Sequence, residues 1–288
     1  MRKDLRERIG KEWLFCDGGT GSFLQARGLQ GGELPELWNI SHPEVIRELY
    51  ESYLKAGCDI FNANTFGANL LKYPENLEEV VEAGVKLACE ARDLCGREDA
   101  YIAIDIGPTG KLLEPMGDLS FDEAVRIFSA TVNAGVKAGC DLVLIETMID
   151  LEETRAAVTA AKENSDLPVI ASVTLEKNGR MMLGADLPEI AEKLEEAGAD
   201  ALGLNCGFGP EIMLEHLKAL RPLTELPLLI TPNAGLPRRE EGRTVYDVRP
   251  DDFAAVMERI VSSGANAVGG CCGTTPEHMS ALIKKLVK

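Results

Sequence analysis

Residues 138–148, AGCDLVLIETM, hold in one stretch the features that decide the fold. Gly139 follows a long amphipathic segment, at the position where a glycine closes a helix in the left-handed conformation. The run LVLIETM (142–148) is mostly apolar, as expected of a parallel strand buried on both faces. Glu146 stands near its end. The stretch therefore predicts a helix, a glycine turn and a buried strand that ends on a polar side chain.

Segments similar to AGCDLV (138–143) recur along the chain: AGCDIF (56–61), AGADAL (197–202) and SGANAV (263–268). Amphipathic segments with apolar residues at i, i+3, i+4 and i+7 precede several of them and predict helices. Eight βα units predict an α/β protein with a single (β/α)8 barrel over residues 1–288, and a doubly wound open sheet is the alternative. The eight predicted strands are 14–19, 59–65, 101–107, 142–148, 168–175, 201–207, 227–235 and 266–273.

The composition excludes some classes of binding partner and indicates a cellular location. The chain has 288 residues, and 30 basic against 47 acidic side chains give it a formal charge of −17. Such a charge argues against a nucleic-acid or anionic-membrane partner. The absence of a signal peptide and of a membrane-length apolar run predicts a cytoplasmic protein. The eight cysteines are then expected to be thiols or metal ligands and not disulfides.

Three of these cysteines stand where a barrel places its active site, at the carboxyl ends of the strands. Cys206 ends the sixth predicted strand, and Cys271 and Cys272 end the eighth, within GGCCG (269–273). The sixth and eighth strands are next-but-one neighbours in a closed barrel, and the glycines free the backbone so that both adjacent sulfurs can turn inward. Three converging thiolates predict a zinc site with an open fourth position. The alternative is that all three are core thiols.

Six motifs occur in order over essentially the whole chain: DGGTGSFLQ (17–25), NTFGAN (64–69), IETMID (145–150), LNCG (204–207), PNAG (232–235) and GGCCGTTPEH (269–278). Together they resemble the homocysteine S-methyltransferase family, and most closely the homocysteine-binding module of cobalamin-dependent methionine synthase. The resemblance implies that zinc on Cys206, Cys271 and Cys272 binds the homocysteine thiol. The thiolate then attacks a methyl donor and gives methionine.

The resemblance also implies that Asp17 and Glu146 bind the amino group of homocysteine, and two carboxylates in a cleft do favour a cation. Gly18 and Gly19 are predicted to offer backbone N–H groups to the substrate carboxylate. Asn233 is the predicted oxygen ligand of zinc when substrate is absent. Ordinary structural roles remain the alternative for the acids, which precede turns or helices, and for Asn233, a turn asparagine.

The residues of this chain leave several methyl donors as alternatives. The chain shows no Asp-x-His-x-x-Gly corrinoid signature, so methylcobalamin would arrive on another domain or protein, with corrinoid-carrying and folate-binding partners. S-methylmethionine or betaine is the alternative donor. A second alternative is a module that docks a corrinoid protein and has little activity alone. A third is an unrelated barrel enzyme such as a Schiff-base aldolase, for which Lys177 is the lysine nearest a strand end.

Overall fold

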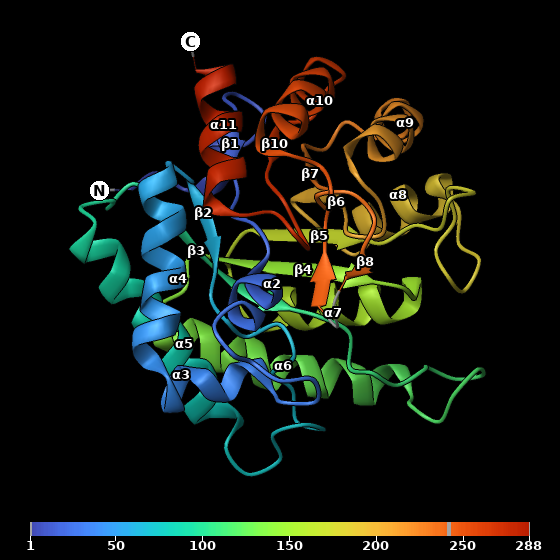
Figure 1. Ribbon diagram of the computed structural model, residues 1–288. Coiled ribbons are helices and arrows are strands. Elements are labelled where there is room, and N and C mark those ends of the chain that lie inside the picture. The colour runs from blue at the N-terminus through green and yellow to red at the C-terminus, as the bar shows by residue number, and fades with distance from the viewer. Residues whose placement is uncertain (1, 241–242, 288) are drawn as a thin grey trace.

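A closed barrel of eight parallel strands stands inside a ring of helices (Figure 1). The computed structural model describes residues 2–240 and 243–287. The barrel strands are β1 (Leu14–Phe15), β2 (Ile60–Asn62), β3 (Tyr101–Ile106), β4 (Leu142–Met148), β5 (Val169–Val173), β6 (Ala201–Asn205), β7 (Leu228–Thr231) and β10 (Ala267–Val268). The outer helices are α4 (Pro43–Ala56), α5 (Leu77–Leu94), α6 (Phe121–Ala138), α7 (Leu151–Asn164), α8 (Leu187–Glu196), α9 (Pro210–Leu220), α10 (Pro250–Ser262) and α11 (Pro276–Leu286).

Shorter elements occupy the two ends of the barrel and the loops. They are α1 (Leu5–Arg8), α2 (Thr20–Gln25), η1 (Pro35–Leu37), α3 (Trp38–Ser41), η2 (Arg221–Leu223) and the hairpin of β8 (Arg238–Glu240) and β9 (Arg243–Val245). The hairpin lies between β7 and α10, and the sequence did not predict it. Across the described ranges, none of the helices combines the length and the apolar character needed to cross a lipid bilayer.

The order of the strands confirms the predicted barrel and excludes the alternative, a doubly wound open sheet. The strands are hydrogen-bonded in the order β1-β10-β7-β6-β5-β4-β3-β2, and every neighbouring pair within the barrel is parallel. A parallel bridge between Cys16 and Ile60 joins β1 to β2 and closes the ring. All eight predicted strands exist, but most are shorter than predicted. The largest correction is β10, which ends at Val268, so that the paired cysteines lie in the loop that follows it.

The recurring AGCD-type segment has two structural roles. Its glycine adopts a positive φ at the end of the helix, 105° at Gly57 and 97° at Gly139, which avoids the steric cost to a side chain. The acidic or amide residue that follows then accepts a hydrogen bond from the backbone of the neighbouring strand. The four bonds are Phe15 N–H to Asp59 at 3.0 Å, Ile102 N–H to Asp141 at 2.8 Å, Val169 N–H to Asp200 at 2.8 Å and Leu228 N–H to Asn266 at 2.9 Å.

The barrel interior changes from apolar to polar along its axis. Near the amino ends of the strands, an apolar cluster fills the barrel with side chains that include Leu14, Ile60, Tyr101, Leu142, Ile170, Ala201 and Leu229. Because side chains alternate along a strand, residues an even number of positions further on face the same interior. Those at the carboxyl ends are polar: Asn62, Asp105, Glu146, Ser172, Asn205 and Thr231. The fold therefore presents a polar layer at one end of a sealed apolar core.

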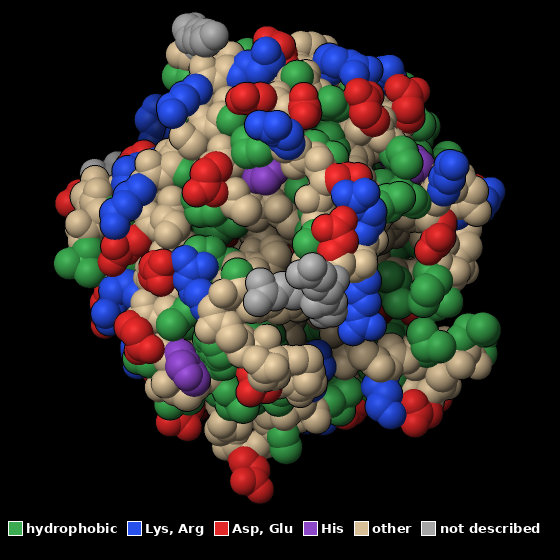
Figure 2. Space-filling model, in the orientation of Figure 1, with side chains coloured by type: hydrophobic (Ala, Val, Ile, Leu, Met, Phe, Trp, Pro, Cys, Tyr) green, Lys and Arg blue, Asp and Glu red, His purple; other side chains and the backbone are tan. Residues whose placement is uncertain are grey.

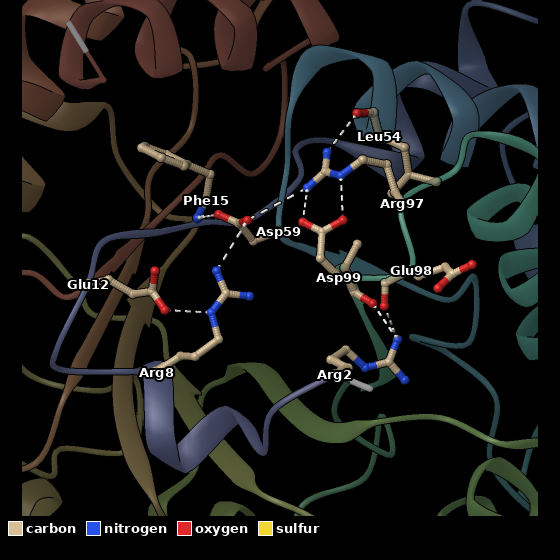
Figure 3. Close-up of polar contacts among 10 residues, drawn as sticks. Arg2, Arg8, Glu12, Phe15, Leu54, Asp59, Arg97, Glu98 and Asp99 are labelled. Carbon is tan, nitrogen blue, oxygen red and sulfur yellow. Dashed lines mark hydrogen bonds and ion pairs between the residues drawn. The ribbon is translucent and has the colours of Figure 1, made fainter.

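Helix α1 seals the opposite end, where Leu5 and Ile9 join the apolar cluster. Figure 3 shows Asp59 between two arginines, with Arg8 and Arg97 each 3.7 Å from its carboxylate. An open cavity of about 360 Å³ at this end is lined by Arg2, Lys3, Arg8, Glu12, Glu98, Asp99 and Tyr101. Arg8 pairs with Glu12 at 2.6 Å and Arg97 with Asp99 at 3.0 Å, so these contacts support the fold.

Candidate functional site

The carboxyl ends of the strands open toward the viewer in Figure 1, with α2 and the β8–β9 hairpin in front of them. In Figure 2 the centre of this face is hollowed and mostly tan, which marks backbone and uncharged polar side chains. Four buried oxygens at this end of the barrel lack a hydrogen-bond partner: Asn62 Oδ1, Asp105 Oδ1, Thr231 Oγ1 and Asn233 Oδ1. Because buried polar atoms are nearly always paired, such a group indicates a place that a ligand or water completes.

The three predicted cysteines meet at this end of the barrel. The Sγ atoms of Cys206, Cys271 and Cys272 all lie within 4.8 Å of one another, and the residues are half-buried. Cys206 follows β6 directly and has a φ of 58°, a left-handed conformation that is uncommon for a residue with a side chain. Its N–H donates to the carbonyl of Thr231 at 3.1 Å, so the strained residue is anchored to β7.

Both neighbouring sulfurs face the site because the cysteine pair is outside the strand pleat. The Cys271 N–H donates to the Pro232 carbonyl at 2.9 Å, and the Cys272 carbonyl accepts from Ala234 at 3.0 Å. The loop lies so close to β1 that a Cβ on Gly269 would be 2.8 Å from the Asp17 carbonyl oxygen. Glycine there is a packing requirement, and the predicted convergence of the two strand ends is confirmed.

The donor set fits a soft metal ion. The pKa of Cys206 is lowered, because the thiols of Cys271 and Cys272 and the side chain of Asn233 hydrogen-bond to its sulfur. Three sulfurs that share protons in this way have the composition of a zinc site. Asn233 contacts this sulfur while its own Oδ1 is buried and unpartnered. The role of Asn233 as the fourth ligand stays a prediction.

Tyr246 is a site residue that sequence reasoning missed. Its hydroxyl donates to the sulfur of Cys272, and burial is the main cause that raises the pKa of the tyrosine. Its ring lies over Gly273, where a side chain would clash with it. The hairpin thus delivers one hydrogen-bond donor to the cysteine cluster. No motif marks this residue, because its approach depends on how the loop after β7 folds back.

Acidic side chains gather beside the cysteines. Asp17 is 4% exposed and accepts the Asn62 N–H at 2.8 Å. Burial raises the pKa of Asp17 to about 7. Burial, and then the charges of Asp17 and Cys206, raise the pKa of Glu146 to about 8. Burial, with the charges of Glu146 and Asp17, also raises the pKa of Asp105.

Within residues 2–240 and 244–287, no lysine or arginine forms an ion pair with Asp17, Asp105 or Glu146. Buried carboxyl groups without a counter-charge favour the binding of a cation, because a cation restores the ionised form. The structure therefore brings an uncompensated acidic group and a cluster of three thiols together at the same end of the barrel. Asp105 adds a third carboxyl to the predicted pair.

We expect Asp17→Asn to stabilise the ligand-free protein at alkaline pH. The folded-state pKa of Asp17, about 7, lies above the value near ~3.9 of an unfolded chain. Its burial therefore costs nothing below about pH 4, and the cost grows as the pH rises toward 7. The gain in the free energy of unfolding should be about 2–4 kcal/mol at pH 8 and should fall to about 1 kcal/mol or less at pH 4.5. Urea unfolding at the two pH values measures it, and equal gains at both would contradict the assignment.

The two predicted glycines pack tightly. A Cβ on Gly18 would be 2.8 Å from the Tyr53 hydroxyl, and one on Gly19 would be 2.8 Å from the Cys271 carbonyl oxygen. The Gly19 N–H donates to the Thr274 hydroxyl at 3.2 Å and is therefore already engaged. The role in carboxylate binding stays a prediction, and it falls mainly on Gly18. Lys177 lies exposed in a turn beyond β5, which removes the strand-end lysine that a Schiff-base aldolase requires.

Comparisons with known proteins identify the family to which the chain belongs. A family model described as homocysteine S-methyltransferase matches residues 14–286. Methionine synthase from Mycobacterium tuberculosis is 31% identical over 297 residues, which cover 96% of this chain and 25% of that protein. The methionine synthase of Mycobacterium leprae is also 31% identical, with coverages of 96% and 24%. The chain thus spans about a quarter of the length of these curated relatives.

Solved structures extend the likeness to the whole fold. The apo form of the homocysteine methyltransferase MmuM from Escherichia coli is 26% identical, with a TM-score of 0.76 and 96% of both chains covered. Its metallated form gives a TM-score of 0.81 at 24% identity, over 96% of this chain and 97% of that one, which shows the fold alone. Since the family model spans nearly the whole sequence, this chain belongs to the homocysteine S-methyltransferase family.

Proposed function

We propose that this protein transfers a methyl group to the thiol of homocysteine in a zinc-dependent reaction that gives methionine, with methylcobalamin on another domain or protein as the donor. One observation carries the proposal: a cluster of three thiols stands beside the buried carboxyl groups of Asp17 and Asp105 and the half-buried one of Glu146, which have no counter-charge among the described side chains. A soft-metal site suits the substrate's thiol, and an acidic site suits its ammonium. Homocysteine carries both groups on one short chain.

Each residue then has a defined task. Cys206, Cys271 and Cys272 would hold the zinc ion, and Asn233 supplies the unpartnered oxygen beside them. When bound, zinc supplies a way to keep a thiol deprotonated near neutral pH, where a free thiol with a pKa of about 8.5 is mostly protonated. Three cysteine thiolates give their site a negative charge, which keeps an additional sulfur reactive. Tyr246, which donates to Cys272, withdraws part of that charge.

The carboxyl groups orient the substrate. Asp17 and Glu146 bind the ammonium, and the unpartnered oxygens of Asp105 and Asn62 offer two more acceptors near it. With the amino group held, the sulfur has a defined direction of attack. The new S–CH₃ bond forms as the bond from the methyl group to the donor breaks, and its electron pair leaves with the donor. This displacement needs no nucleophile from the protein itself.

The choice of donor rests on the resemblance to the cobalamin-dependent module and on the methionine synthase relatives, of which this chain matches about a quarter. Corrinoid-carrying and folate-binding partners belong to the same proposal. A specific observation favours a second candidate: the homocysteine methyltransferase MmuM matches over 96% of both chains. A homocysteine methyltransferase that has the extent of this chain and uses a small donor, for which S-methylmethionine or betaine is the candidate, is the alternative.

A donor panel tests the proposal. We expect zinc-loaded protein to make methionine from homocysteine and methylcobalamin, and to make little with a methylfolate, S-methylmethionine or betaine. Chelation should stop turnover, and added zinc should restore it. Turnover with S-methylmethionine or betaine alone would select the alternative donor. Homocysteine binding without turnover on any donor would identify a docking module, and no homocysteine binding would reject the proposed function.

A further inference from the structure

The end of β4 carries an irregularity next to the acidic group. Ile145 pairs with Ala171 on β5, but Met148 pairs with Val173, so β4 uses one residue more than its partner. Within this bulge Thr147 has a φ of 59°. A β-branched residue rarely adopts this left-handed conformation. Bulges are common next to active sites, and this one sets the backbone conformation directly after Glu146, whose side chain faces the barrel interior.

The side chain of Asn205 holds this bulge. Its Oδ1 accepts the Thr147 N–H at 2.9 Å and the Ser172 hydroxyl at 2.9 Å. Its Nδ2 donates to the Thr147 hydroxyl at 2.7 Å. Asn205 is 0% exposed, so water does not compete for these bonds. One carboxamide thus bonds both the N–H and the hydroxyl of a strained residue on a different strand.

The same residue also borders the thiol cluster. Asn205 is the last residue of β6 and directly precedes Cys206, whose φ of 58° is left-handed as well. Its backbone carbonyl accepts the Thr174 hydroxyl at 3.0 Å. Asn205 therefore connects two strained points, one that aims a sulfur and one that aims a carboxylate. Its replacement should change the spacing between these two groups.

We propose that Asn205 is a positioning residue that acts through Glu146. By holding Thr147 in the left-handed conformation, it keeps the Glu146 carboxylate where it can bind the ammonium of a homocysteine whose sulfur is at the cysteine cluster. The ligand named here rests on the proposed function. The residue acts without touching the substrate, so its effect must depend on the presence of the Glu146 charge.

A double-mutant comparison tests this dependence in zinc-loaded protein. We expect Asn205→Ala to raise the Kd of homocysteine, measured by calorimetry, about tenfold, which is about 1.4 kcal/mol. In a Glu146→Gln background the same replacement should change the Kd less than twofold, because there is no charge left to position. Ser172→Ala is the matched control. It removes one donor to Asn205 but leaves both bonds to Thr147, and should leave the Kd within twofold.

An equal rise in Kd with and without the Glu146 charge would overturn the proposal, since Asn205 would then act by another route. If Asn205→Ala does not fold, Thr147→Val removes the Oγ1 acceptor and keeps the side-chain shape. Its smaller rise in Kd should likewise vanish in the Glu146→Gln background, and a rise that persists there overturns the proposal. A wild-type protein that binds no homocysteine would reject the proposed function and this inference with it.

Discussion

Replacing Cys206, Cys271 or Cys272 with alanine is expected to abolish methyl transfer and to lower the zinc content from near one ion per chain to a small fraction of that value. The three sulfurs lie within 4.8 Å of one another, so each would contribute one bond to the proposed zinc ion. Loss of one ligand weakens zinc binding and opens the site to water. Metal analysis and methionine formation measure the two effects, and circular dichroism should show an intact barrel.

The chain offers matched controls for this experiment. Cys58 and Cys140 are buried at the amino ends of β2 and β4, away from the cluster. Cys140→Ala and Cys58→Ala remove a buried thiol and should keep both zinc and activity, with a modest loss of stability. Full zinc occupancy in a Cys206→Ala, Cys271→Ala double variant would show that the metal binds elsewhere.

Glu146→Gln is expected to raise the Kd of homocysteine about 10- to 100-fold, because a hydrogen bond to a charged group contributes about 1.5–3 kcal/mol. The glutamine keeps the shape of the side chain and removes the charge opposite the ammonium. Asp17→Asn should act in the same direction. Calorimetry on zinc-loaded protein measures the Kd, and the zinc content of both variants should equal that of the wild type.

The ligand supplies the sharper control. 4-Mercaptobutyrate, which is homocysteine without its amino group, should bind the wild type and Glu146→Gln equally well. Glu152→Gln on the exposed face of α7 should leave the Kd of homocysteine unchanged. If both acidic variants bind homocysteine as the wild type does, then Asp17 and Glu146 have structural roles and the ammonium site lies elsewhere.

Local signals account for most of what could be predicted. The glycines of the AGCD-type segments end helices at Gly57 and Gly139. Glycine adopts a positive φ readily, and a glycine can be recognised directly in the sequence. Apolar runs predicted all eight strands, since burial on both faces requires them. The strand bounds were less accurate. The run at 266–273 continues as far as Gly273, yet the strand ends at Val268 because the following loop hydrogen-bonds to other strand ends.

The barrel, the convergence of Cys206 with Cys271 and Cys272, and the acids after β1 and near the end of β4 could be predicted from the sequence by itself, because the type of each residue and the succession of strands along the chain can be read there directly. Only the tertiary structure decided the left-handed conformations of Cys206 and Thr147, the bulge beside Glu146 and the approach of Tyr246. These features depend on contacts between residues far apart in the chain, such as the hydrogen bond between Asn205 and Thr147, which are 58 positions apart. A contact of that kind fixes a backbone angle against its local preference, and no short stretch of sequence records it.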